Sequence, residues 1–126
     1  MGDIDLWQAT RTNTSAELGN VTNLGPTINS PSRDSGAHIS SDGLVLFFES
    51  DRAGGAGKND LYLSTRPTKD APFGKPVSFD ATINTPDAEQ GPCLSSDGQT
   101  LMFYSDRPGG QGEADIWMSR RVPVSK

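Results

Sequence analysis

Four aspartates flank two glycine-rich loops, and their types and spacing come nearest to a metal site in this chain. The shared residues are Asp51, Arg52 and Asp60 in one loop and Asp106, Arg107 and Asp115 in the other. Paired carboxylates with loop carbonyls suit a hard cation such as Ca²⁺. Aspartates also accept hydrogen bonds from backbone N–H groups in tight turns, and an arginine can pair with a nearby carboxylate. Because the same residues occur in both loops, the structural interpretation is favoured, and no metal or cofactor is assigned.

The single histidine and the single cysteine, His38 and Cys93, are the remaining candidates for nucleophilic or metal chemistry. One cysteine excludes a disulfide within the chain and a zinc site built on paired cysteines. Two ligands complete neither a zinc site nor a catalytic triad. We therefore expect both residues to be packed or channel-lining side chains, and we predict that the chain is not an enzyme.

The composition limits the elements that could position such residues. The chain has 126 residues, 33% of them apolar, with 14 glycines and 9 prolines. This combination argues against a helical bundle, a coiled coil or a membrane span and favours a turn-rich all-β protein or disorder. The net charge is −5 and no run of lysine or arginine exceeds two residues, so nucleic-acid binding is not expected. The first residues lack the apolar stretch of a secretory signal.

The chain contains a repeat of 55 residues, and this repeat favours an all-β protein over disorder. Residues 36–66 align with residues 91–121 without a gap, and 16 of the 31 positions are identical. A partial third copy aligns residues 5–11 with 60–66 and 115–121. Self-similarity at a fixed period is the signature of repeat architectures. Trp7, Tyr62 and Trp117 are equivalent in the three copies, which favours a packing role for these side chains.

Each full unit predicts four short strands and no helix. Asp42-Gly43 and Asp97-Gly98 predict tight hairpin turns, because glycine tolerates a positive φ there. The expected strands are 37–40 or 92–95, 44–49 or 100–104, 61–64 or 116–119, and 77–79, which matches 21–24. Four strands at this period are the pattern of a β-propeller blade.

The run from Ser40 to Tyr62, like its copy from Ser95 to Trp117, resembles the TolB-like family of β-propeller repeats. The shared pattern is Ser-x-Asp-Gly, a Leu-x-Phe strand, Ser-Asp-Arg, a Gly-Gly loop, and an Asp before a strand with an aromatic residue. The resemblance implies four-stranded antiparallel blades, with the glycine-rich loops and the inter-blade loops 26–35 and 81–90 at one end. It also implies a bacterial, periplasmic or exported parent protein and a role in binding other proteins; the location of this chain is left open.

The repeat divides the chain into three segments. Residues 1–25 correspond to strands three and four of a blade, residues 26–80 to a whole blade, and residues 81–126 to a blade without its fourth strand. Two blades cannot close a ring, because propellers take about four to eight. We expect the ring to be completed by self-association or by missing chain, and three copies would give six blades.

The sequence thus predicts a non-catalytic β-propeller scaffold that displays loops for protein binding and self-assembles. Binding residues are sought where the units differ, in the inter-blade loops: Arg33, Asp34, Asp87, Glu89 and Gln90. The residues shared by both units are interpreted as structural. A propeller fragment of a hydrolase or peptidase and a glycan-binding propeller are the alternatives. A downstream Gly-x-Ser-x-Gly elbow in the full gene would indicate the hydrolase, and a flat glycan-array profile would exclude the lectin.

Overall fold

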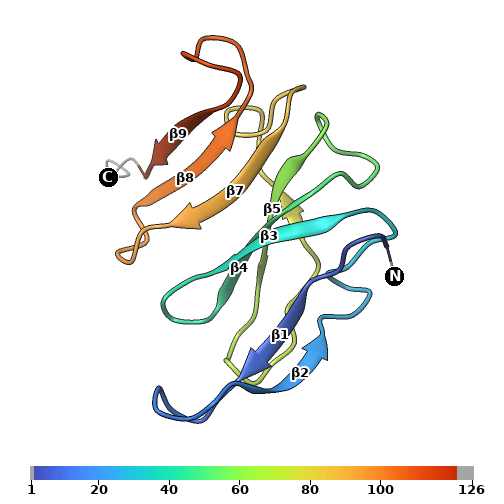
Figure 1. Cartoon of the computed structure of the whole chain (residues 1–126), viewed down its shortest axis with the longest axis vertical. Coiled ribbons are helices and arrows are strands. Elements are labelled where there is room, and N and C mark those ends of the chain that lie inside the picture. Colours follow the sequence, from blue (N-terminus) through green and yellow to red (C-terminus); the bar gives the residue numbers. More distant parts are fainter. Residues whose placement is uncertain (1, 122–126) are drawn as a thin grey trace.

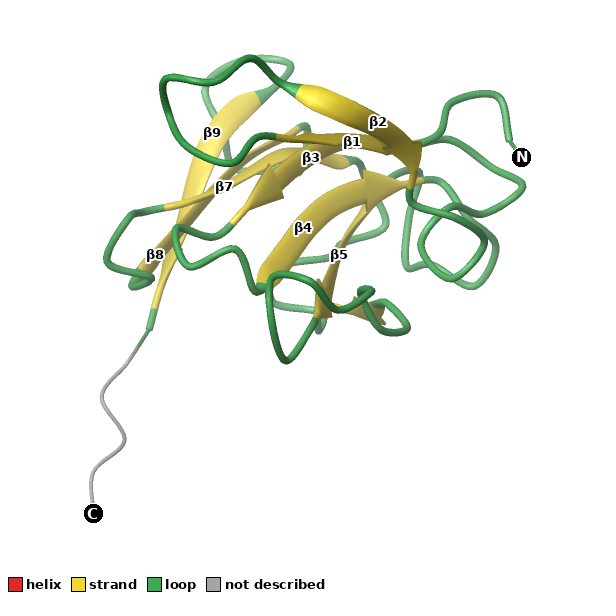
Figure 2. Cartoon of the chain, turned by 90° about the horizontal axis from the view of Figure 1, so that it is seen from below, coloured by secondary structure: helices red, strands yellow, loops and turns green. Residues whose placement is uncertain are grey.

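The computed structural model describes residues 2–121, which form nine strands and no helix (Figure 1 and Figure 2). The strands are β1 (Trp7–Thr10), β2 (Gly19–Asn23), β3 (Asp34–Ile39), β4 (Val45–Ser50), β5 (Asp60–Thr65), β6 (Val77–Ser78), β7 (Glu89–Leu94), β8 (Thr100–Ser105) and β9 (Asp115–Arg120). They make three antiparallel sheets in chain order: β1-β2, β3-β4-β5-β6 and β7-β8-β9. The predicted all-β class is confirmed. Within the described residues, no helix is long and apolar enough to cross a membrane.

The first strand of each full unit begins three residues earlier than predicted. Asp34 pairs with Ser50, and Glu89 holds the same place one repeat later; each strand then passes a register shift. Gly36 and Gly91 lie at these shifts with φ of 61° and 62°, a conformation that glycine adopts without steric cost. Because the bulge lets pairing continue beyond the glycine, residues 34–35 and 89–90 belong to strands and were wrongly expected in loops.

The two predicted hairpins are present and close in the same way. Their glycines, Gly43 and Gly98, have φ of 77° and 73°. Asp42 Oδ1 accepts hydrogen bonds from the Ser40 hydroxyl (2.6 Å) and the Leu44 N–H (3.0 Å). These two bonds hold the pKa of Asp42 below its ordinary value. The second hairpin repeats both bonds around its own aspartate, so these aspartates form turns.

Two hydrophobic cores lie between the sheets and repeat at the interval of the sequence. The first core, between the β1-β2 sheet and the four-stranded sheet, contains Leu6, Ile28, Leu46, Phe48, Tyr62 and Phe73. The second, between the four-stranded sheet and the β7-β8-β9 sheet, contains Phe47, Leu61, Ile83, Leu101 and Phe103. Successive residues of a strand face opposite sides, so Phe48 enters the first core and Phe47 the second. Figure 1 shows the three sheets following one another along the long axis.

Candidate functional site at the sheet junctions

An asparagine from the linker holds each junction between sheets. Asn29 accepts a hydrogen bond from the Leu6 N–H (2.7 Å) and donates one to the Leu6 carbonyl (3.0 Å). Asn84 makes the same two bonds with Leu61, at 2.8 and 3.0 Å. Both asparagines are buried, and a buried amide that satisfies both backbone groups of one residue fixes where the linker crosses the sheet. We call each pair, Asn29 with Leu6 and Asn84 with Leu61, an asparagine clamp.

A buried ion pair lies near each clamp. Asp34 accepts a hydrogen bond from Arg52 Nη2 at 2.6 Å and two more from the Ser30 N–H and hydroxyl, at 2.6 and 2.9 Å. At the second junction, Glu89 takes the place of Asp34 and lies 3.3 Å from Arg107 Nη2. The longer glutamate therefore fills the same role as the aspartate, and the substitution between units conserves the ion pair.

The arginine of each pair also contacts two aromatic rings. The guanidinium carbon of Arg52 lies 5.1 and 4.9 Å from the ring centroids of Phe48 and Tyr62. Arg107 lies 5.2 and 5.3 Å from the corresponding rings of the next unit. A cation over an aromatic face is attracted by the ring electrons. Each arginine also donates to the isoleucine carbonyl of its linker, so it ties strand, linker and core together.

The charge of Asp34 is fixed by this environment. Burial by itself raises the pKa of the carboxyl group, but hydrogen bonds from Ser50, Arg52 and Ser30 outweigh it and leave the pKa below its ordinary value. Hydrogen bonds to the charged form stabilise that form. Asp34 is therefore ionised at neutral pH, and its acceptor oxygens are committed to groups of the same chain.

The aspartates that flank the glycine-rich loops bind backbone N–H groups. Asp51 accepts a hydrogen bond from the Arg33 N–H (2.8 Å), and Asp106 accepts the equivalent bond from Ala88 (2.9 Å). Asp115 accepts two loop N–H bonds, at 2.8 and 3.2 Å. These contacts agree with the structural interpretation of the loop carboxylates. In the part of the chain that the structure describes, no group of three or more His, Cys, Asp or Glu side chains could hold a metal ion.

The five predicted binding residues separate into two sets. Arg33 is exposed, and Asp87 and Gln90 are half-buried. Asp34 and Glu89 are 0% exposed, because they begin strands and point at the arginines of the ion pairs. These two were therefore misread as residues of a displayed surface. The aspartate of one unit and the glutamate of the other form the same ion pair within their junctions. The other three residues remain candidates for binding.

The loops and the hairpins lie at different ends of the sheets. The Lys58 N–H in a glycine-rich loop donates to the Asp87 carbonyl of the following linker (3.2 Å). At the hairpins, the Ser41 hydroxyl donates to the Ser96 carbonyl (3.2 Å), and Figure 1 places both of these turns on its left side. Linkers and glycine-rich loops together form what we call the loop end, on which Arg33 is exposed.

The two residues with reactive side chains lie on equivalent strands and differ in burial. His38 on β3 is half-buried, with its ring centroid 6.4 Å from that of Phe47. Cys93 on β7 is exposed, so it is not a packed side chain, and a channel-lining role for this cysteine stays a prediction. It lies on the sheet whose outer face has no neighbour among the described residues.

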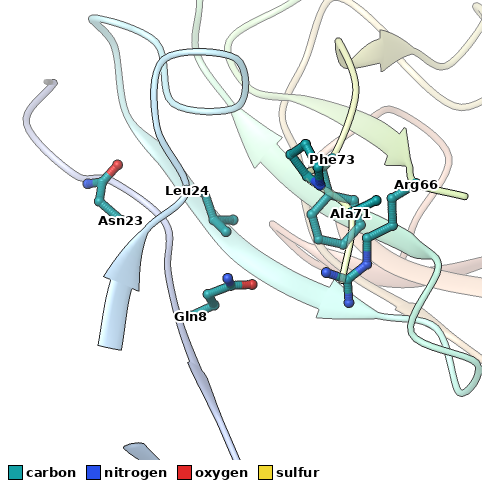
Figure 3. Close-up of a pocket in the computed structure, with 7 residues that line it drawn as sticks. Gln8, Asn23, Leu24, Arg66, Ala71 and Phe73 are labelled. Carbon is teal, nitrogen blue, oxygen red and sulfur yellow. The ribbon is translucent and has the colours of Figure 1, made fainter. Parts of the chain in front are cut away.

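A cleft between the first and second sheets was missed by sequence reasoning. It has a volume of about 190 Å³ and is lined by Gln8, Asn23, Leu24, Arg66, Ala71, Pro72 and Phe73. Figure 3 shows the Gln8 side chain reaching from β1 into the space between Leu24 and Arg66. A signal for it was present, because the residue equivalent to Gln8 is Leu63 in the next copy. A polar side chain replaces an apolar one over a core position.

Comparison with known proteins leaves the family open. No protein-family model, no curated protein sequence and no solved structure matches this chain significantly.

Proposed function

We propose that the chain is a non-catalytic β-propeller module of TolB-like blades that binds another protein through its loop end and associates with copies of itself. The observation that carries the proposal is the repetition of one junction. The clamp and the arginine–aromatic contact recur 55 residues apart with nearly the same distances, and the ion pair recurs at 2.6 and 3.3 Å. Units that stack through one repeated junction extend with a constant rotation, which is how solenoids and propellers are built.

The ionisable groups that recur in both units are bonded to other groups of the same chain, which supports a binding function instead of catalysis. Asp34, Arg52 and Asp51 make bonds that hold the scaffold, and the second unit repeats those bonds. Of the residues that vary, Arg33 is exposed on the loop end, and Gln90 is half-buried near it. A rigid scaffold with variable loops is a common basis for recognition.

A matched pair of surface variants tests the proposal. Arg33→Glu with Gln90→Lys alters the loop end, and Lys69→Glu with Gln99→Lys makes the same kinds of change elsewhere on the surface. Proteins retained from a lysate of the source cells are compared on the wild type and both variants, and each purified candidate is then titrated. We expect a partner whose affinity falls at least about tenfold for the loop-end variant alone, a loss of about 1.4 kcal/mol. Equal retention on both variants, or turnover of a peptide or ester substrate by the pure chain, would contradict the proposal.

A further inference from the structure

The outer face of the β7-β8-β9 sheet carries apolar side chains that are buried one repeat earlier. Ile116 is 72% exposed, whereas its counterpart Leu61 is 0% exposed. Met102 is also exposed, whereas its counterpart Phe47 is buried in the second core. The counterparts are covered by the linker and sheet that follow them. Within residues 2–121, nothing covers the last sheet, and a contiguous apolar face of this kind marks an interaction site.

The two covered sheet faces of this chain show which kind of segment would fit over the last sheet. At each, the linker crosses the strand beside a glycine: a Cβ on Gly2 would lie 2.0 Å from the Ser32 carbonyl oxygen, and one on Gly57 would lie 2.2 Å from the Asp87 carbonyl oxygen. Gly112 is the third equivalent residue, and a Cβ there would have nothing within 4 Å. The last strand and the loop before it therefore carry the apolar residue and the glycine that receive a linker with a clamp asparagine.

We infer that β9 of one copy takes the place of β1 in a second copy, where it enters the Asn29 clamp and pairs with β2. This rests on the self-association in the proposed function. Strands β1 and β9 are the same strand of the repeat, since Asp5-Leu6-Trp7 corresponds to Asp115-Ile116-Trp117. Ile116 then takes the place of Leu6, so that its backbone N–H and carbonyl bond the Asn29 side-chain amide. The product is a four-stranded sheet of β7, β8 and β9 from one copy and β2 from the next.

Strand β1 is weakly held, and β9 is already ordered. All four residues of β1 are exposed, and Trp7 is 61% exposed. In contrast, β9 pairs with β8 over six residues, and its Trp117 packs against the second core. Because β1 is tethered beside its site, it competes at a high effective concentration. β9 pays no ordering cost on docking, and it brings Ile116 out of water in exchange for Leu6.

The cleft of Figure 3 gives β9 a second advantage over β1. Gln8 lies in this cleft beside Leu24 and Phe73. The residue at the equivalent position of β5, Leu63, packs against the second core, and the equivalent residue of β9 is Met118. A flexible thioether side chain fills an irregular apolar gap well. Exchange thus replaces a polar side chain by an apolar one over the first core and removes exposed apolar surface from the last sheet.

Repeated exchange gives a head-to-tail assembly with two complete sheets per copy. The surfaces in contact differ on the two copies, so the interface is heterologous, and such interfaces close into rings when the rotation permits. Two, three or four copies would supply four, six or eight blades, within the range of propellers.

Engineered disulfides in the full chain test the exchange. Gln8 pairs with Thr22 in the native register, so exchange places Met118 of one copy opposite Thr22 of the next. In a Cys93→Ser background, Thr22→Cys with Met118→Cys should form a disulfide between copies. Figure 1 shows β2 and β9 at opposite ends of the molecule, which excludes the bond within one copy because the Cα atoms must lie within about 7 Å. Covalent multimers on oxidation are the expected result.

Locking β1 in place provides the matched control. Gln8→Cys with Thr22→Cys, in the same background, joins β1 to β2 within one copy. By light scattering we expect the wild type above 13.4 kDa, the oxidised locked variant at the monomer mass, and recovery of association on reduction. Gly112→Ala should leave thermal stability unchanged at the lowest protein concentration and weaken association roughly tenfold, because the side chain meets the incoming linker.

Two results would overturn the exchange. If the wild-type chain stays monomeric up to its solubility limit, a second copy does not cover the last sheet. If the locked variant associates as strongly as the wild type, association does not require the displacement of β1. Neither result bears on the proposed protein binding, which is read from the Arg33 and Gln90 variants. Conversely, loss of any loop-end partner would leave the disulfide test unaffected.

Discussion

Replacement of Asn84 by alanine tests the central claim that a linker asparagine holds neighbouring sheets together. The Asn84 side chain bonds both backbone groups of Leu61 and also donates to the Ser78 hydroxyl and the Phe79 carbonyl, at 3.0 and 3.2 Å. Leu61 is 0% exposed, so water cannot readily take over these bonds. Asn84→Ala therefore leaves the buried Leu61 N–H without a partner, whereas the Leu61 carbonyl keeps the bond from the Phe79 N–H (3.3 Å).

The expected cost follows from the Leu61 N–H. A buried backbone group that loses its partner costs about 1–3 kcal/mol, so this donor predicts a loss of that size. The total free energy of unfolding of a domain is about 5–15 kcal/mol, and the variant should unfold at much lower urea concentration. The second core lies at this junction, so the loss should affect the whole fold.

Urea unfolding followed by circular dichroism measures the loss, and amide hydrogen exchange at Leu61 locates it. Asn13→Ala is the control, because Asn13 is exposed and its side chain makes only short-range bonds, such as the one that Oδ1 accepts from the Ser15 N–H (2.9 Å); we expect about 1 kcal/mol or less. Asn29→Ala should speed exchange at Leu6 while Leu61 stays protected. A loss below about 1 kcal/mol for Asn84→Ala, with exchange at Leu61 unchanged, would show that the asparagine does not hold the two sheets together.

Three further predictions concern the same junctions. Arg52→Met should destabilise the fold by about 3–5 kcal/mol because it leaves the buried Asp34 carboxylate unpaired; a variant as stable as the wild type in urea would show that the pair contributes little. Gly57→Ala should be strongly destabilising, because its Cβ would lie 2.2 Å from a linker carbonyl. Gly112→Ala places its Cβ in open space and should change the free energy of unfolding of the monomer by about 0.5 kcal/mol or less. Equal effects of the two substitutions would contradict the linker contact. The lowered pKa of Asp34 predicts a contribution to stability that is present above the unfolded pKa of about 3.9 and is lost as the pH falls through the folded pKa. The urea concentration at the unfolding midpoint should therefore decrease when the pH is lowered below about 4. A midpoint that increases in this pH range would exclude this contribution.

The repeat made much of the fold predictable from local pattern. The repeat and the Asp-Gly turns indicated seven strand positions in residues 26–126 and two more in the partial copy of residues 1–25, because hairpin chemistry is local. The bulges at Gly36 and Gly91 were not predicted. A bulge depends on the partner strand, and nothing in the local pattern distinguishes a bulge glycine from a loop glycine. This is why Asp34 and Glu89 were placed on a surface instead of in the ion pairs.

The all-β class, the period of 55 residues and the hairpin turns could be predicted from the amino-acid sequence, since each depends on local pattern. The roles of the polar residues depend instead on contacts between distant parts of the chain. The Asn29 and Asn84 clamps join residues 23 positions apart, and the bond from Arg52 to Asp34 spans 18. Such partners are chosen by how the sheets pack. Packing also decided that Leu61 is buried and Ile116 exposed, although the two occupy the same position of the repeat, because burial depends on the neighbouring sheet and not on the residue.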